Sequence, residues 1–238
     1  WDKNNLRYLK NVSRRHPELR PWLHCAELLN ASLAPGLAIS PPLFTGYIGF
    51  GYVYQYWCTQ HIHRALHKHL QARGWRSLPQ ASGLPPGRAI HWQSPTGERL
   101  VLYAERRYAP NEKTLPAEPL YSISRGQQPD LSLVYFEGGT QWERQQAKSG
   151  LVFEIKFRQD AYGRPRKVDL DRLHAYRDAV YVYHPSQERH PLFVGGALLY
   201  PGRNERYSPG LEALTCLPHH ELRLEYLLHH LFYPHRST

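Results

Sequence analysis

Two short apolar runs in the middle of the chain constrain its fold more than any other feature. They cover residues 131–136 and 151–157, and a Gly-Gly pair followed by a polar, charged tract separates them. Runs of this length that are bounded by turn residues are typical of β-strands, and the intervening segment indicates a hairpin with a long tip. We therefore expect a sheet in which these two strands are neighbours.

Charged residues stand at the ends of these predicted strands. Asp130 opens the first strand, while Glu154 and Lys156 lie two residues apart on the second, so that alternation directs both side chains to one face. A Glu-x-Lys pair alone is usually an exposed pair on the polar face of an amphipathic strand. Two carboxylates and an ammonium group that converge at a strand end can instead hold a hard divalent cation through oxygen ligands and place a cationic group beside an attacking water.

The motif Pro129-Asp130 followed by Glu154-Ile155-Lys156 resembles the signature of the PD-(D/E)XK nuclease superfamily. The Pro-Asp pair, placed one hairpin upstream, makes this resemblance more specific than a Glu-x-Lys pair alone. The fold that it implies is α/β, with a restriction-endonuclease-like central mixed β-sheet flanked by helices and preceded by an N-terminal helical extension.

Two further segments resemble one branch of that superfamily, which holds the McrC-type subunits of modification-dependent restriction systems and related uncharacterised nuclease-domain proteins. The segment Asp-Leu-Asp-Arg-Leu-His-Ala-Tyr-Arg-Asp-Ala-Val at residues 169–180 is similar to a helix of that branch. Residues 52–58 are similar to its first core helix, which often carries Glu where this chain has Gln55. The similarity covers about residues 45–232.

The resemblance also implies roles for individual residues. Asp130 and Glu154 would ligate Mg²⁺ (or Mn²⁺), with the Ile155 carbonyl as a further oxygen ligand. Lys156 would orient or deprotonate a water molecule and offset negative charge on a phosphate. The implied activity is that of a Mg²⁺-dependent endonuclease that hydrolyses DNA phosphodiester bonds, as the effector of a restriction or phage-defence system.

Three more residues are candidates for contacts around this site. Gln55 falls on the apolar face of a predicted helix, so it is either a core amide with hydrogen-bond partners or a residue that reaches the metal through water. Under the second interpretation, we expect Gln55→Glu to keep the fold and to strengthen metal binding. Tyr176 is a candidate for packing or for contacting a phosphate. Arg158 is either a phosphate contact or a plain surface arginine.

The charge of the chain favours a polyanionic partner. There are 30 Lys and Arg residues against 20 Asp and Glu residues, a formal net charge of +10, and such an excess favours nucleic acid through counterion release. The 3 cysteines are far apart, which excludes a cysteine-based zinc finger. No apolar run approaches the length of a membrane span, about 20 residues, and no secretory signal opens the chain, so we expect a cytoplasmic setting.

The expected organisation is one nuclease domain behind a helical segment. Residues 1–44 should form this N-terminal helical segment and a linker, and residues 45–238 the nuclease domain. Within the domain the predicted helices cover residues 52–73, 169–180 and 220–232, the first ending at Gly74 and the second capped by Asp169. The predicted strands outside the hairpin are 89–93, 99–103, 120–124 and 192–200.

A different class of function stays open, namely a nucleic-acid-binding or adaptor subunit with a degenerate nuclease fold that partners a motor NTPase. The intact Asp130, Glu154 and Lys156 argue against such a loss of activity, whereas Gln55 leaves it open. The chain has no Gly-Lys-Ser/Thr loop, so an AAA+ type NTPase would be a separate subunit or lie in a segment absent from this sequence. The candidate partners are DNA, such an NTPase and, in a homodimer, a second copy of the chain.

Overall fold

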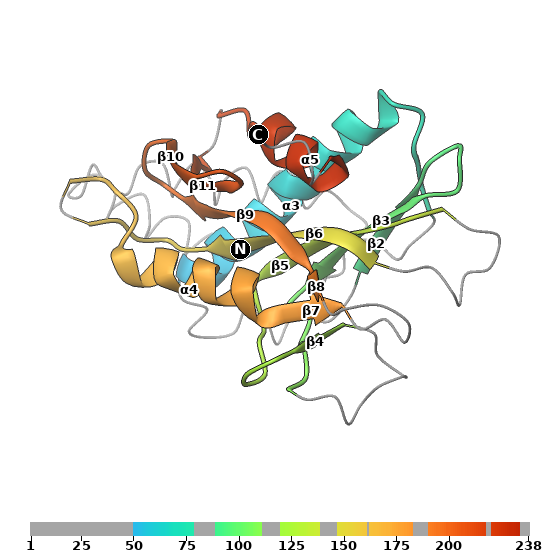
Figure 1. Cartoon of the computed structure of the whole chain (residues 1–238). Helices are drawn as coiled ribbons and strands as arrows, with labels where there is room; N and C mark the ends of the chain where they lie inside the picture. The colour runs from blue at the N-terminus through green and yellow to red at the C-terminus, as the bar shows by residue number, and fades with distance from the viewer. Residues whose placement is uncertain are drawn as a thin grey trace, which may run out of the picture.

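A mixed β-sheet of eight strands forms the centre of the computed structural model, and helices cover both of its faces (Figure 1). The structure describes residues 50–78, 89–110, 120–138, 147–160, 162–182, 190–217 and 220–233. The helical segment and linker predicted for residues 1–44 lie outside these ranges, so the domain boundary at residue 45 stays a prediction. The predicted α/β fold, with a central mixed sheet flanked by helices, is confirmed.

The two strands of the predicted hairpin lie in the middle of this sheet. Its spatial order is β1-β2-β3-β5-β6-β9-β11-β10. All neighbours are antiparallel except β6 with β9 and β9 with β11, which are parallel. The strands are β1 (Arg76–Ser77), β2 (Ala89–Gln93), β3 (Arg99–Ala104), β5 (Leu131–Phe136), β6 (Ala147–Ile155), β9 (Phe193–Tyr200), β10 (Glu205–Ser208) and β11 (Leu211–Thr215). The antiparallel pairing of β5 with β6 confirms the hairpin.

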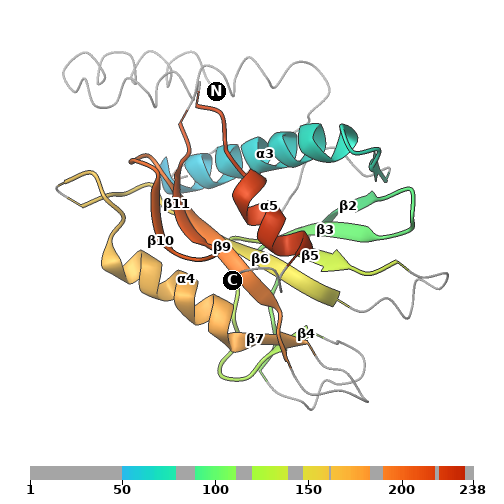
Figure 2. The same cartoon turned by 45° about the horizontal axis from the view of Figure 1, so that its top comes forward.

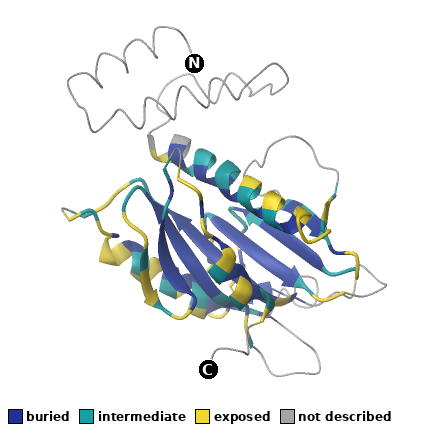
Figure 3. Ribbon diagram, turned by 90° about the horizontal axis from the view of Figure 1, so that it is seen from above, coloured by how far each residue is buried: buried dark blue, intermediate teal, exposed yellow. Residues whose placement is uncertain are grey.

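Each face of the sheet has its own hydrophobic core. The helices α3 (Phe50–Gln71) and α5 (Glu225–Phe232) cover one face, and α4 (Lys167–Ala179) covers the other (Figure 2). A small sheet of order β4-β7-β8 joins the core on the α4 side; its strands are β4 (Leu120–Ser122), β7 (Val180–Val182) and β8 (His190–Pro191). The central strands are buried, and exposed residues gather on the helices and loops (Figure 3).

Strand β6 shows how the sequence divides its residues between the two cores. Leu151, Phe153 and Ile155 belong to the core beneath α3 and α5, whereas Val152 belongs to the core beneath α4. Because side chains alternate along a strand, Glu154 shares the α4 side with Val152. The apolar residues of β6 therefore direct this carboxylate towards α4.

Helix α3 ends as the sequence predicts. Gly74 has a φ of +79°, the left-handed conformation that glycine adopts without a steric penalty. Its N–H donates to the Gln71 carbonyl at 3.0 Å, and the N–H of Trp75 donates to the Leu70 carbonyl at 3.0 Å. These two bonds form the Schellman motif and confirm Gly74 as the C′ residue. Across the parts of the chain that the structure describes, no helix is both long enough and apolar enough to span a membrane.

Two predicted helix boundaries are wrong. Helix α4 begins at Lys167 with Arg166 as the N-cap residue, so Asp169 does not cap it. The Asp169 carboxylate is buried in the first turn, where the Arg158 side chain binds it. Helix α5 begins at Glu225 rather than at residue 220. The buried Leu222 that precedes it contributes to the core without being helical.

Five strands were not expected from the sequence. They are β1, β10 and β11 in the large sheet and β7 and β8 in the small one; of these, β1, β10 and β8 lie at a sheet edge. Strand β10 is only partly buried and has no clear alternation of apolar and polar residues, and β7, which is 3 residues long, directly follows α4. Their place is set by pairing with neighbours rather than by a pattern of their own.

Candidate active site

The register of β5 and β6 brings the predicted catalytic residues together. Leu131 at the start of β5 pairs with Phe153 near the end of β6. Asp130, which precedes β5, therefore stands beside Glu154 and Lys156. Alternation along the two strands sends all three side chains to the same side of the sheet.

The ammonium group of Lys156 lies at the centre of this cluster. Its Nζ is 2.5 Å from Oε1 of Glu154, 3.3 Å from Oδ2 of Asp130 and 3.1 Å from the carbonyl oxygen of Ile155. These three oxygens are the set for which the sequence predicts metal ligation. The structure thus places three of the predicted residues around the ammonium group of the fourth. This group is mostly shielded from solvent, since the Lys156 side chain is 18% exposed.

Asp130 is held by both of its carboxylate oxygens. The backbone N–H of Ile155 donates to Oδ2 at 2.7 Å, and the Gln55 amide donates to Oδ1 at 3.3 Å. One anchor comes from the neighbouring strand and the other from helix α3 on the opposite face. The carboxylate is therefore oriented before any ligand binds, which lowers the entropic cost of binding one.

Glu154 is the most deeply buried group of the site, with 1% of its surface exposed. Its Oε1 contacts Lys156 and, at 3.4 Å, the Arg172 guanidinium of α4. Its Oε2 is also buried and has no hydrogen-bond partner among the described residues. Burial, together with the negative charge of Asp130, raises the pKa of Glu154 above its usual value, and Lys156 offsets this rise only in part. A carboxylate with a free buried oxygen is poised to accept a further donor or a cation.

Gln55 lies at the site rather than in the interior of the core. Its Nε2 donates to Oε1 of Glu105 at 3.0 Å as well as to Asp130. Sequence reasoning did not identify Glu105, which follows β3 in a charged segment that reads as a turn. The pairing of Ala104 with Leu131 would have identified it, because that register places Glu105 opposite Asp130.

The other predicted contact residues occupy the rim of the site. Arg158 donates to both carboxylate oxygens of Asp169, from Nε at 3.0 Å and from Nη2 at 2.5 Å. Tyr176 is buried, and its hydroxyl donates to the Gln128 carbonyl at 3.2 Å. Burial, followed by the charge of Glu154, raises the pKa of Tyr176 to about 12. Both side chains thus have partners within the protein, and phosphate contacts by them stay predictions.

The chemistry of the donors suits a hard divalent cation. In the residues that the structure describes, no group of three or more His, Cys, Asp or Glu side chains could hold a metal ion. A site here would rely on the Asp130 and Glu154 carboxylates with the Ile155 carbonyl, and Mg²⁺ and Mn²⁺ prefer such oxygen ligands. The ammonium group already held by the same oxygens, and the unpartnered Oε2 of Glu154, show that the cluster accepts positive charge.

Comparison with known proteins identifies the family. The sequence model of the PD-(D/E)XK nuclease superfamily matches residues 52–205, well over half of the chain. No curated protein and no solved structure matches the chain. The match includes β5, β6, α3 and α4, the elements that position the site, and nucleases of this superfamily generally use divalent metal ions. The McrC-type branch stays a prediction. The chain belongs to the PD-(D/E)XK nuclease superfamily.

Proposed function

We propose that this protein is a metal-dependent endonuclease that hydrolyses DNA phosphodiester bonds as the effector of a restriction or phage-defence system. The observation that carries the proposal is the enclosure of the Lys156 ammonium by oxygens of Asp130, Glu154 and Ile155. Both carboxylates and the lysine that the family signature requires are present and in contact. This arrangement favours an active enzyme over a degenerate nuclease fold.

Each residue of the cluster has a separate task in phosphodiester hydrolysis. Asp130, Glu154 and the Ile155 carbonyl would hold Mg²⁺ or Mn²⁺, which supplies Lewis-acid stabilisation of the phosphate and a more acidic water. Lys156 exchanges its carboxylate contacts for contacts with the substrate, orients the attacking water and neutralises charge that develops on the phosphate. Arg172 contacts the Glu154 carboxylate and adds a second positive charge beside the site.

Two features support DNA as the substrate. The net charge of +10 favours a polyanion. The resemblance to McrC-type subunits favours modified or foreign DNA over other polyanions. The same resemblance makes a separate AAA+ type NTPase a candidate partner, alongside a second copy of the chain.

Cleavage by the purified protein tests the proposal. We expect duplex DNA to be cut in Mg²⁺ or Mn²⁺ and not in EDTA, and we expect Lys156→Ala to abolish cleavage while leaving DNA binding intact. Lys167→Ala is the matched control, since this lysine pairs with Asp171 on the helix surface and its side chain is 89% exposed. Binding without cleavage by the parent protein would support the alternative, a nucleic-acid-binding or adaptor subunit for a motor NTPase. Preferential cleavage of RNA would refute the assignment of DNA.

A further inference from the structure

One carboxylate next to the predicted metal ligands has no role in the mechanism above. Oε1 of Glu105 accepts a hydrogen bond of 3.0 Å from the same Gln55 nitrogen that donates to Asp130 at 3.3 Å. An amide nitrogen has two hydrogens, so Gln55 serves one carboxylate with each. Gln55 therefore holds the two carboxylates close together.

The backbone of Glu105 is strained in the conformation that allows this contact. Its φ of +50° lies in the left-handed region, and among the described residues it is the only non-glycine with a positive φ. A residue with a side chain rarely adopts this conformation, and such strain persists where the surrounding structure imposes it. Here the N–H of Glu105 donates to the Asp130 carbonyl at 3.0 Å. Glu105 is thus joined to the Asp130 strand by its backbone and to the Asp130 carboxylate through Gln55.

The carboxylates around the site outnumber the cationic side chains that contact them. Three carboxylates, those of Glu105, Asp130 and Glu154, lie within one chain of contacts, and Lys156 already pairs with the last two. Among the described residues, Glu105 forms no ion pair or hydrogen bond with a Lys or Arg side chain. Such a group adds negative potential where a divalent cation would bind.

We propose that Glu105 is a third carboxylate of the divalent-cation site, which it reaches through a bound water, and that Gln55 is the positioning residue that holds it there. The inference deepens the proposed function, since it concerns the same cation. It assigns the acidic group contributed by β3 to metal binding, a role that neither the family match nor the sequence motif gives to that strand.

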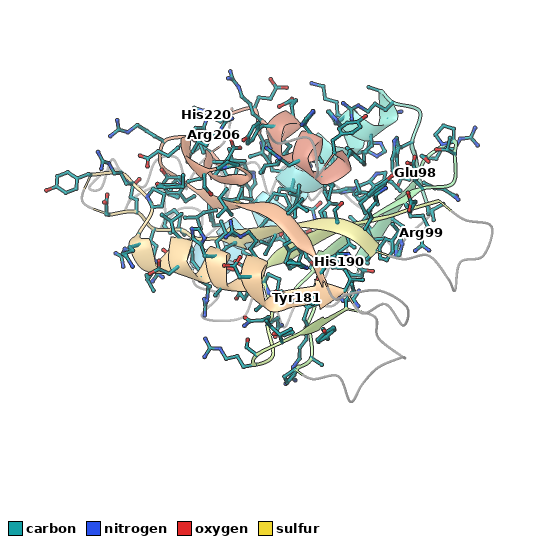
Figure 4. The ribbon with its side chains drawn as sticks, viewed as in Figure 1. Glu98, Arg99, Tyr181, His190, Arg206 and His220 are labelled. Carbon is teal, nitrogen blue, oxygen red and sulfur yellow. The ribbon has the colours of Figure 1, made fainter. Side chains whose placement is uncertain are left out.

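Divalent-cation binding measured without nucleic acid tests the proposal. Mn²⁺ is titrated into the full chain by isothermal calorimetry, and the amount of free Mn²⁺ is followed in parallel by electron paramagnetic resonance. We expect Glu105→Gln to weaken Mn²⁺ binding by about 10- to 100-fold, as is typical when a partner outside the first ligand shell is lost. The matched control is Glu98→Gln, because Glu98 (labelled in Figure 4) precedes β3 at the end of the strand opposite to Glu105.

A charge-swap variant separates a role in cation binding from a role in folding. In Gln55→Glu/Glu105→Gln the carboxylate and the amide exchange places. The hydrogen bond between positions 55 and 105 is kept, and the one from position 55 to Asp130 is lost. We expect this variant to recover Mn²⁺ affinity to within a few-fold of the parent. Gln55→Glu alone places a new carboxylate against Glu105 and Asp130, so we expect lower thermal stability in EDTA, in contrast to the sequence-based expectation of an unchanged fold. The deficit should shrink when Mn²⁺ is added.

The outcomes distinguish this inference from the proposed function. Parent-like Mn²⁺ affinity in Glu105→Gln would refute the role of Glu105 and leave the nuclease proposal intact. A charge-swap variant that folds but stays as weak as Glu105→Gln would refute the idea that a carboxylate in this pair strengthens Mn²⁺ binding through its negative charge. If the parent binds Mn²⁺ and cleaves no nucleic acid, the proposed function fails while the role of Glu105 is still decided by the titration. A parent that does not bind Mn²⁺ would overturn both.

Discussion

Replacing Glu154 by glutamine should stabilise the metal-free protein while it removes activity. The ionised carboxylate is 1% exposed, lies beside Asp130 and leaves Oε2 without a hydrogen-bond partner among the described residues. A neutral amide of the same shape avoids the cost of burying this charge. Lys156 keeps its contacts with Asp130 and with the Ile155 carbonyl, so the substitution strands no cation.

The size of the gain follows from the charge that is removed. A buried polar group without a partner costs about 1–3 kcal/mol, and more when it is charged. The amide keeps a polar atom in the place of Oε2, so only the part due to the charge is recovered, and the lost pair with Lys156 offsets some of it. We expect a net increase of about 1 kcal/mol in the free energy of unfolding, which raises Tm by about 2–4 °C for a chain of this size.

The stability gained by Glu154→Gln should depend on pH. Because the pKa of Glu154 is raised in the folded state, the folded protein binds this proton more tightly than the unfolded chain does. Stability from this group therefore falls as the pH rises from the usual glutamate pKa through the folded-state pKa, and it stays low above that. The advantage of Glu154→Gln should be absent at acidic pH, where both side chains are neutral, and should grow through this window.

Metal should reverse the order of stabilities. A cation that binds only the folded parent stabilises it by about 2.7 kcal/mol at 100 times its Kd, whereas Glu154→Gln loses a ligand. The assay is thermal denaturation across pH in EDTA and in Mg²⁺. The matched control is Asp169→Asn, because Asp169 is equally buried but receives two hydrogen bonds from Arg158. We expect a loss of about 1–2 kcal/mol there, with or without metal. A Glu154→Gln protein that melts below the parent in EDTA at neutral pH would refute the reasoning.

The remaining predictions concern packing, hydrogen bonding and charge. Gly196→Ala should lower the free energy of unfolding by about 1–3 kcal/mol or more, because the added Cβ would clash with the backbone carbonyl of Val152 on β6. Gly51→Ala, with open space around it, should show no such loss in the same denaturation experiment. Tyr108→Phe should cost about 1–3 kcal/mol by leaving the buried Ser132 hydroxyl without its donor at 2.7 Å, and adding Ser132→Ala should recover part of that cost in a double-mutant cycle. Affinity for duplex DNA should fall with a log–log slope of about −0.9 per phosphate contact as salt increases, and a flat response in a fluorescence-anisotropy titration would contradict an electrostatic interface.

The sequence by itself was enough to predict the core of the site. Asp130, Glu154 and Lys156 converge because two neighbouring strands pair, and because alternation fixes which side each residue faces. Both properties are local: a period of two along each strand, and the pairing of two strands that follow one another in the sequence. The end of α3 at Gly74 was predictable for the same reason, since the left-handed residue acts within one helical turn.

Where local patterns were ambiguous, the predicted helix boundary was wrong. Asp169 has the side chain of a helix cap, yet its carboxylate is bound by Arg158, and the helix starts two residues earlier. Leu222 and Leu224 fit the apolar spacing of the last helix but are buried outside it. In both cases the same residue type satisfies two structures, and long-range packing chooses between them.

Only the tertiary structure decided what surrounds the candidate cluster of Asp130, Glu154 and Lys156. Gln55 meets Glu105 and Asp130 across 50 and 75 positions of the sequence, and Arg172 reaches Glu154 from the opposite face of the sheet to α3. These contacts depend on the rotation of α3 against the sheet and on the register of β3 with β5. Neither the helix rotation nor the strand register produces a periodic pattern in the sequence, because both depend on how many side chains pack in the two cores.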